Sequence, residues 1–231
     1  MASEQITTLS IFKYPNFLAK VWAFGMMQFA HNSLQKAEGC SFYKLMGSGK
    51  ENFNPFPDWS VYAVLQVWEN HEKADAFIHH SKLFQGYFSK SAKHQILYMK
   101  SIQARGEWNG GNPFQKASPD EGKPMVCAIT RASIKWSKML TFWKFVPTSQ
   151  KPLLNASGLV YTKGFGEVPF VEMATCSIWE NANNLNQFAY QSREHVEAIK
   201  KTRNIQWYKE ELFSRFQLVK SEGNLLELNV D

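Results

Sequence analysis

The chain has 231 residues, of which 44% are hydrophobic and 15% aromatic, and its formal net charge is +6. Disordered chains are poorer in aromatic residues, so this composition indicates a globular protein with room for a full core and an apolar pocket. No run approaches the roughly 18 apolar residues that would span a bilayer, and no basic leader precedes an apolar run at the amino terminus. We therefore expect neither a transmembrane nor a secreted protein.

Three cysteines, Cys40, Cys127 and Cys176, lie far apart and form no CxxC pattern. An odd number of scattered cysteines is typical of reduced thiols, and it argues against a disulfide framework or a structural zinc site. The sequence thus favours a cytoplasmic location.

The hydrophobic pattern predicts the elements of the first half in chain order. They are a strand over 7–12, a helix over 16–31, strands over 41–46 and 60–68, helices over 71–79 and 81–90, and a strand over 99–104. Residues 105–123 hold four glycines and two prolines and are expected to form a linker.

The second half repeats this order. It predicts a strand over 126–134, a helix over 137–149, strands over 159–165 and 171–179, helices over 182–190 and 192–203, and a strand over 213–219. Asn181 and Ser192 precede the two later helices and are expected to cap them.

Internal similarity supports this division. The stretch Ala63–Asn70 matches Ala174–Asn181 at an offset of 111 residues, and the first copy carries about eight extra residues within 47–59. The expected fold is α+β, with two ferredoxin-like β-α-β-β-α-β repeats whose sheets close a barrel-like core in one chain. The expected units are residues 1–110, a linker over 111–124, and residues 125–231.

Basic residues gather where acids are absent, over 76–106 and 122–166. Such a surface suits single-stranded nucleic acid, an anionic membrane or ordinary solvation, but no nucleic-acid motif is present. The segment Trp136–Val146 has a wide apolar sector edged by Trp and Lys, which suits a membrane interface. The pattern fits a helix buried under a sheet as well, and we favour burial.

His195 marks a difference between the two copies, because Phe84 occupies the equivalent position. On a helix His195 shares one face with Ala198, Ile199 and Thr202. A single inward imidazole in an aromatic pocket without acids suits a heme iron, which takes one proximal nitrogen. A core histidine bonded to a backbone carbonyl is the alternative. Zinc and non-heme iron fit poorly, because no second ligand lies at suitable spacing. The sequence has no P-loop, GxGxxG or Gly-x-Ser-x-Gly motif.

Several motifs together resemble the spheroidene monooxygenase family. They are Phe24-Gly-Met-Met27, Phe42-Tyr-Lys-Leu-Met-Gly-Ser-Gly49, Ala104-Arg-Gly-Glu-Trp108, Thr130-Arg-Ala-Ser133, Phe142-Trp-Lys-Phe145, Lys163-Gly-Phe-Gly-Glu167, Phe188-Ala-Tyr-x-Ser192 with His195, Thr202-Arg203, and Trp207-Tyr-x-Glu-Glu-Leu-Phe-x-Arg-Phe216. The resemblance spans about residues 8–223. It extends to the dimeric α+β barrel superfamily, in which several heme enzymes carry an axial histidine on a helix after a Trp-Glu strand end.

This resemblance implies a heme-dependent oxygenase that converts C2 of an acyclic carotenoid to a ketone. It implies heme b with His195 as axial metal ligand. We expect Phe188, Ile199, Trp179 and Trp207 to line the heme, with plain core packing as the alternative for each. Arg131 and Lys163 are candidate catalytic cations near bound oxygen, with ordinary ion pairing as the alternative.

Electrons are expected from a separate ferredoxin or reductase, because the chain has no flavin or nicotinamide motif. The implied substrate is an apolar small molecule, and a peripheral contact with the inner membrane is an open expectation. The oligomeric state stays open and includes a homodimer. Two other functions fit the sequence: a heme lyase of the aldoxime dehydratase type, and a non-catalytic protein that binds heme or another apolar ligand.

Overall fold

The computed structural model describes residues 4–50, 54–154, 156–191 and 205–228. Its strands are β1 (Ile6–Lys13), β2 (Cys40–Lys50), β3 (Asn54–Trp68), β4 (Lys93–Gly106), β5 (Val126–Ile134), β6 (Leu159–Val168), β7 (Glu172–Trp179) and β8 (Tyr208–Gly223). Its helices are α1 (Phe17–Phe29), α2 (His31–Leu34), α3 (His71–His80), α4 (Lys82–Lys90), α5 (Met139–Leu154) and α6 (Ala182–Gln191), with a 3-10 helix η1 (Trp136–Lys138).

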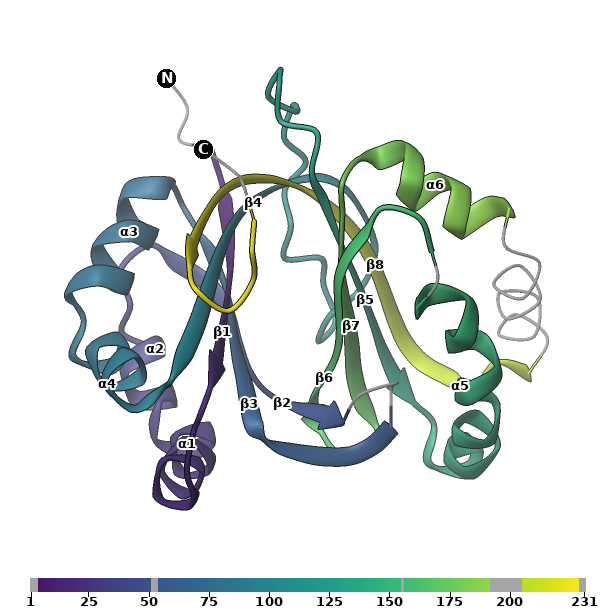
Figure 1. The fold of residues 1–231 in the computed structure, drawn as a ribbon, viewed down its shortest axis with the longest axis horizontal. Helices are drawn as coiled ribbons and strands as arrows, with labels where there is room; N and C mark the ends of the chain where they lie inside the picture. Colours follow the sequence, from purple (N-terminus) through teal and green to yellow (C-terminus); the bar gives the residue numbers. More distant parts are fainter. Residues whose placement is uncertain (1–3, 51–53, 155, 192–204, 229–231) are drawn as a thin grey trace.

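The strands form one closed antiparallel barrel in the order β1-β3-β2-β6-β7-β5-β8-β4. The expected mixture of helices and strands with a barrel-like core is therefore confirmed. The two halves of the chain share this sheet, because β2 pairs with β6 and β8 lies between β4 and β5. Helices from the first half cover the barrel on one side, and α5 and α6 lie on the other (Figure 1).

The sequence located most elements correctly but misjudged several lengths. The strand expected over 213–219 is the 16-residue β8, because it pairs with both β4 and β5 along its length. The strand expected over 60–68 is the 15-residue β3, which already begins at Asn54. Asn181 caps α6 as expected, since its Oδ1 accepts the N–H of Asn184 at 3.0 Å. Ser192 and the helix expected over 192–203 lie outside the described residues.

Alternation along each strand separates an interior face from an outer face. In β5 the buried side chains of Cys127 and Ile129 face the interior, where they join aliphatic side chains from the other strands. Val126 and Ala128 face outward and pack beneath α6. Burial of apolar surface on both faces stabilises the barrel by about 25 cal/mol per Å² removed from water.

The expected linker contributes to the barrel core. Trp108 is 2% exposed and Phe114 is 6% exposed, and both belong to the interior cluster. The ring of Phe114 meets that of Phe216 edge-on at 4.9 Å, and Trp108 packs against Phe42 at 5.6 Å. The segment between β4 and β5 therefore fills space that the strands leave open.

The outer face of the first half is covered by one continuous core. Residues from α1 to α4 pack with outward side chains of β1, β3 and β4 in a single cluster. Even Ser10, at the middle of β1, is fully buried. Phe84 of α4 lies at the centre, with its ring 5.8–6.0 Å from those of Phe12, Phe77 and Tyr87.

We predict that Phe84→Ala lowers the free energy of unfolding by about 3–5 kcal/mol, because it leaves a cavity in a fully packed cluster. The matched control is Phe17→Ala, at a side chain that is 76% exposed, for which we expect a change below about 0.5 kcal/mol. Urea unfolding followed by circular dichroism measures both. Equal effects of the two substitutions would contradict this account of the core.

Candidate functional site

Among the described residues, the outer face of the second half differs from that of the first, because two separate clusters pack on it. One cluster joins Val126, Ala128 and Trp179 to Leu153 and Leu185. The other joins Ile134 and Trp207 to Phe142 and Val146 of α5. Between them, at the middle of β5, Thr130 is exposed.

A row of side chains crosses the sheet at Thr130. Thr130 pairs with Thr175 of β7 and with Phe213 of β8, and Thr175 pairs with Gly164 of β6. The structure leaves Thr175, Phe213 and Gly164 half-buried. Thus three of the four residues in the row are small, and the row lies between two aromatic clusters.

The sequence-predicted aromatic residues flank this row. Trp179 is fully buried, and its ring lies 5.3 Å from that of Phe188 on α6. Trp207 is 2% exposed and contacts Phe142 edge-on at 5.4 Å. The structure therefore brings Trp179 and Phe188 together on one side of the row and places Trp207 on the other.

Two buried N–H donors on this outer face have no hydrogen-bond partner among the described residues. They are Nε of Arg215 and Nε1 of Trp207. Arg215 pairs with Ala128 across β8 and β5, and its Nη2 donates to Asn186 of α6 at 2.7 Å. A buried unpaired donor costs about 1–3 kcal/mol, which makes both groups candidates for contact with a ligand.

Sequence reasoning gave Arg215 no role, although it lies in the motif that ends at Phe216. Nothing in one sequence shows which way a strand arginine faces when the register is unknown. The pairing of Arg215 with Ala128 in the structure decides this orientation.

Arg131 lies on the opposite face of the sheet, inside the barrel. It is 3% exposed and forms ion pairs with Glu172 and Glu210. Its guanidinium carbon lies 5.8 Å from the ring of Trp108, and Ser133 donates to Glu172 at 2.7 Å. The buried charge is thus balanced from two strands, as a buried cation requires.

Lys163 also faces the interior, and its Nζ lies 2.9 Å from Oδ2 of Asp58. A further interior pair joins Lys44 to Glu167, and Glu167 accepts the indole N–H of Trp108 at 2.7 Å. Three interior cations therefore meet four carboxylates. The structure brings Arg131 and Lys163 into this network and separates them, by the thickness of the sheet, from Trp179 and Trp207. A catalytic role for either cation stays a prediction.

Hydrogen bonds hold two of these carboxylates in the ionised form. Burial opposes ionisation of Glu210, but the N–H groups of Gly110 and Asn109 and the charge of Arg131 outweigh it, so the pKa of Glu210 is lowered. At Asp58 burial is likewise outweighed, here by Ser60 and Lys163, and the pKa is lowered. Stability that depends on these carboxylates is present above their ordinary pKa values and is lost as the pH falls through the lowered ones.

Two thiols also face the interior. Cys127 and Cys176 lie 3.5 Å apart, sulfur to sulfur, and all three cysteines are free. The hydrogen bond with Cys176 and complete burial raise the pKa of Cys127 well above its ordinary value. A neutral buried thiol is a poor nucleophile.

His195 and Ile199, the predicted axial ligand and its neighbour, lie outside the described residues. Among the described histidines, His31 is engaged by the hydroxyl of Tyr43 at 2.9 Å. His94 packs against Phe88 with ring centres 4.8 Å apart, and burial lowers its pKa.

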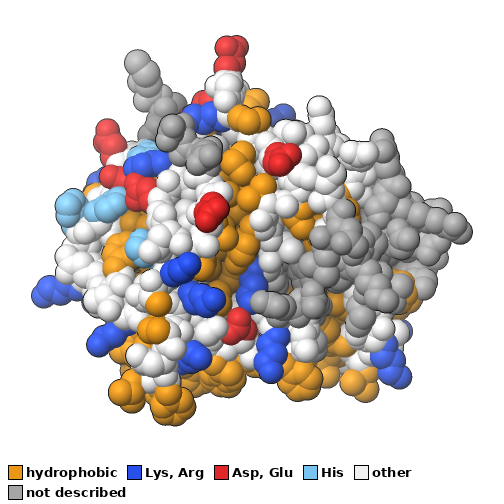
Figure 2. Space-filling model, in the orientation of Figure 1, with side chains coloured by type: hydrophobic (Ala, Val, Ile, Leu, Met, Phe, Trp, Pro, Cys, Tyr) orange, Lys and Arg blue, Asp and Glu red, His pale blue; other side chains and the backbone are white. Residues whose placement is uncertain are grey.

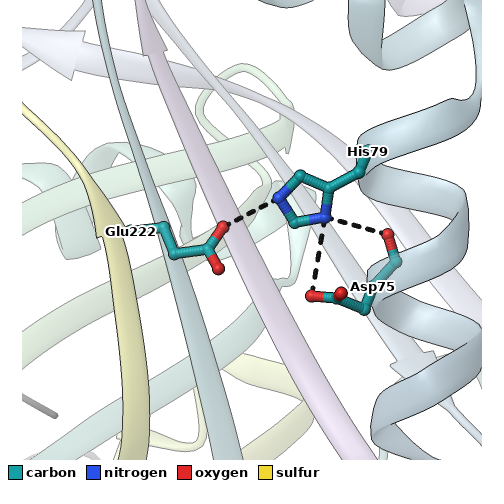
Figure 3. Close-up of side chains that lie close together, drawn as sticks. All are labelled: Asp75, His79 and Glu222. Carbon is teal, nitrogen blue, oxygen red and sulfur yellow. Dashed lines mark hydrogen bonds and ion pairs between the residues drawn. The ribbon is translucent and has the colours of Figure 1, made fainter.

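One further histidine lies between two carboxylates, Asp75 and Glu222 (Figure 3). Nε2 of His79 lies 3.1 Å from Glu222, and Nδ1 lies 3.5 Å from Asp75. Each ring nitrogen of His79 thus contacts a different carboxylate. Lys220 pairs with both of them, at 2.6 Å from Glu222 and 3.4 Å from Asp75. This geometry indicates an ion-pair cluster, because a metal ion needs its ligands to converge and the lysine already neutralises the acids.

A surface pocket of about 430 Å³ lies elsewhere, beside the start of β2. Gln5, Cys40, Ser41, Glu69 and Gln115 contribute to its lining. Burial raises the pKa of Cys40 to about 11, so its thiol is neutral at physiological pH. Of the sequence-predicted site residues that the structure describes, none lines this pocket.

Comparison with known proteins links this chain to one family. The chain is 33% identical over 221 residues to the spheroidene monooxygenase of Cereibacter sphaeroides, covering 95% of this chain and 68% of that protein. It is 32% identical over 223 residues to the spheroidene monooxygenase of Rhodobacter capsulatus, covering 95% and 92%. This chain belongs to the spheroidene monooxygenase family. No family model matches it.

Solved structures share the fold of this family member. A crystal structure of aldoxime dehydratase matches 94% of this chain and 82% of its own with a TM-score of 0.63, at 9% sequence identity. At that identity the likeness concerns the fold alone. None of the helices in the described part of the chain is long and apolar enough to cross a membrane.

We predict that Glu210→Gln makes this spheroidene monooxygenase family member less sensitive to acid. Wild-type stability should fall as the pH drops below about 4.5, because protonation of Glu210 breaks its contacts with Arg131 and the Asn109–Gly110 backbone. The variant should lose about 1–3 kcal/mol at pH 7 and show a shallower decline towards pH 3.

Thermal unfolding across pH measures this effect. The matched control is Glu211→Gln, at an exposed side chain on the next residue, which should follow the wild-type curve. Parallel curves for the wild type and Glu210→Gln would show that Glu210 does not contribute to the acid transition.

Proposed function

We propose that this protein is a monooxygenase that inserts oxygen into an acyclic carotenoid, as a spheroidene monooxygenase does by its name, and that it uses heme b. The observation that carries the substrate class is the 32–33% identity to named spheroidene monooxygenases across 95% of the chain. The C2 position and the conversion to a ketone are part of the proposal.

The row at Thr130 supports a heme site on the outer face of the second half. A flat macrocycle needs a break in the side-chain layer between sheet and helices. Gly164, Thr175 and Thr130 have small side chains, and within the described part of the chain they form such a break. Trp179 and Phe188 on one side and Trp207 on the other supply apolar walls. The unpartnered N–H groups of Arg215 and Trp207 fit a ligand that carries acceptor groups at its edge.

His195 is the proposed axial ligand, on the sequence argument given above, with Ile199 on the same helical face. When bound, the heme supplies an iron that activates dioxygen with two electrons from an external ferredoxin or reductase. The chain's own part is to exclude water with Trp179, Phe188 and Trp207, and to compensate negative charge with Arg215.

Arg131 and Lys163 remain candidates for catalysis. Their interior ion pairs with Glu172, Glu210 and Asp58 also suit a positioning role, since those contacts tie β5 to β7 and β8 and tie β6 to β3. In that role they would hold the sheet beneath the site in one geometry.

We also interpret the chain as two ferredoxin-like repeats arranged like a dimeric α+β barrel. Both halves show the order strand, helix, two strands, helix and a final strand. The units would be residues 1–110 and 125–231, with 111–124 between them.

A heme spectrum tests the cofactor first. We expect the wild type to bind added heme with one-to-one stoichiometry and a defined Soret band. His195→Ala should bind it about 10–100-fold more weakly or with a displaced band. His31→Ala is the matched control, because His31 already contacts Tyr43, and it should bind heme as the wild type does.

An unchanged spectrum in His195→Ala would move the axial ligand to another residue, and no heme uptake by either protein would reject the heme proposal. Product analysis then separates the functions. A carotenoid monooxygenase consumes dioxygen and reductant, an aldoxime dehydratase-type lyase turns over aldoximes without oxygen insertion, and a binding protein gives no product.

We further predict that Arg215→Met weakens heme binding about tenfold, because a charge-assisted hydrogen bond contributes about 1.5–3 kcal/mol. Heme with both propionates methylated should bind the wild type and Arg215→Met alike, since that ligand carries no anion. The control is Arg131→Met, at a residue inside the barrel. It should lower stability but leave the preference for heme over its dimethyl ester unchanged. If Arg215→Met binds heme more tightly than the dimethyl ester by the same factor as the wild type does, the proposed contact between Arg215 and a propionate is excluded.

A further inference from the structure

Large apolar side chains are exposed along one edge of the molecule, which we call the apolar edge. It comprises Phe17, Leu18, Val21 and Phe24 of α1, Phe56 and Trp59 of β3, Trp136 of η1 and Leu140 of α5, all 52–79% exposed. Figure 2 shows hydrophobic side chains along the lower side of the molecule, where α1, the β2–β3 hairpin and α5 lie in Figure 1. Exposed apolar surface on this scale marks an interaction site.

Ring contacts connect the separate segments of the apolar edge. Phe24 of α1 lies 5.2 Å from Trp59 of β3. Phe56 lies 6.4 Å from Phe170 in the β6–β7 turn, and Phe170 lies 6.1 Å from Trp143 of α5. These contacts bring α1, β3, the β6–β7 turn and α5 together, so the segments that carry the apolar edge touch one another across the two halves of the chain.

The β6–β7 turn is built at a cost in backbone energy. Phe170 has φ +67°, in the left-handed region where a bulky residue is rare. The N–H of Val171 bonds to the carbonyl of Val168 at 3.2 Å, and Pro169 and Phe170 occupy the corner positions. Glycine would fit the second corner with less strain, and the ring of Phe170 packs between Phe56 and Trp143 at this place.

Charge around the apolar edge is positive. Lys13, Lys50, Lys135 and Lys138 are exposed and lie within about six residues of the edge residues in the sequence, and Lys20 lies within α1. Neither α1 nor the segment Trp136–Leu154 contains an acidic residue. Asp58, next to Trp59, is paired with Lys163. Aromatic and aliphatic side chains bordered by lysine are the composition of surfaces that lie in the interface of an anionic bilayer.

We propose that the apolar edge binds the surface of an anionic lipid bilayer, with Phe17, Leu18, Trp136 and Leu140 inserted among the headgroups and the lysines contacting lipid phosphates. A second copy of the chain fits less well. A twofold contact would bring the same lysines of both copies together, and the segments that form the edge offer few acids to balance them. The proposal does not depend on heme or on turnover, so its failure is separate from failure of the proposed function.

Sedimentation with vesicles tests the proposal on the full chain without substrate. We expect the protein to pellet with vesicles of phosphatidylglycerol and phosphatidylcholine, and far less with phosphatidylcholine alone. Binding should weaken as salt rises. Tryptophan emission should shift to shorter wavelength with the anionic vesicles, because Trp59 and Trp136 leave water.

Two pairs of substitutions, Phe17→Ser with Leu18→Ser and Trp136→Ser with Leu140→Ser, should each reduce partition to anionic vesicles at least about tenfold. They remove exposed side chains, so unfolding temperatures should stay close to the wild-type value. The matched control is Tyr190→Ser on α6, at an apolar side chain that is 72% exposed but lies off the edge, and it should bind vesicles normally.

Two outcomes would overturn the proposal. The first is found in the sedimentation experiment: either the wild-type protein binds neither vesicle type, or the edge variants bind anionic vesicles as tightly as the wild type does. The second is a dimer in sedimentation equilibrium that dissociates in the edge variants, without vesicle binding, which would assign the edge to a second copy.

Discussion

Closure of the barrel is the constraint on which the other features depend. β2 pairs with β6 and β8 lies between β4 and β5, so each strand has a neighbour on both sides and the two halves share one sheet. Closure gives every strand two neighbours and leaves the sheet without a terminal edge strand that would invite aggregation, although β2 and β6 pair only at Gly47 with Gly166 and at Ser48 with Phe165. Closure also fixes the register of each strand and so places each side chain in the interior or on the outer face. A register shift of one residue would move every side chain of that strand to the other face.

The interior combines apolar packing with paired charges, and the two have separate effects. Aliphatic side chains fill most of the barrel, and Trp108 and Phe114 from the intervening segment complete the filling. Arg131 is balanced by Glu172 and Glu210, and a buried ion pair adds little net stability but costs several kcal/mol when one partner is lost. The ion pairs of this network connect β5 with β7 and β8, and β6 with β3.

In the part of the chain that the structure describes, the two outer faces are packed unequally, and this difference supports the proposed cofactor site. Helices α1 to α4 cover the first half so fully that Ser10 is buried, whereas Thr130 at the corresponding place in β5 is exposed between two small clusters. The proposed cofactor site occupies that interval. α5 links it to the lipid surface that we infer, because Phe142 packs beside Trp207 while Leu140 is exposed on the apolar edge. A carotenoid leaving a bilayer would then meet the protein close to the proposed site.

The sequence by itself determined the order of elements, the mixed fold and the family, because hydrophobic period, helix caps and spaced motifs are local properties of the chain. It predicted that Trp179, Phe188 and Trp207 line a heme, and this stays a prediction. For the segment Trp136–Val146 it favoured burial, whereas the structure buries Phe142 and Val146 and exposes Trp136 and Leu140. Only the tertiary structure decided that Arg131 and Lys163 face the interior while Arg215 faces outward, since strand register depends on partners far along the chain. Only it joined Phe24 to Trp59 and Phe56 to Phe170, because a surface assembled from distant segments exists once the strands have paired.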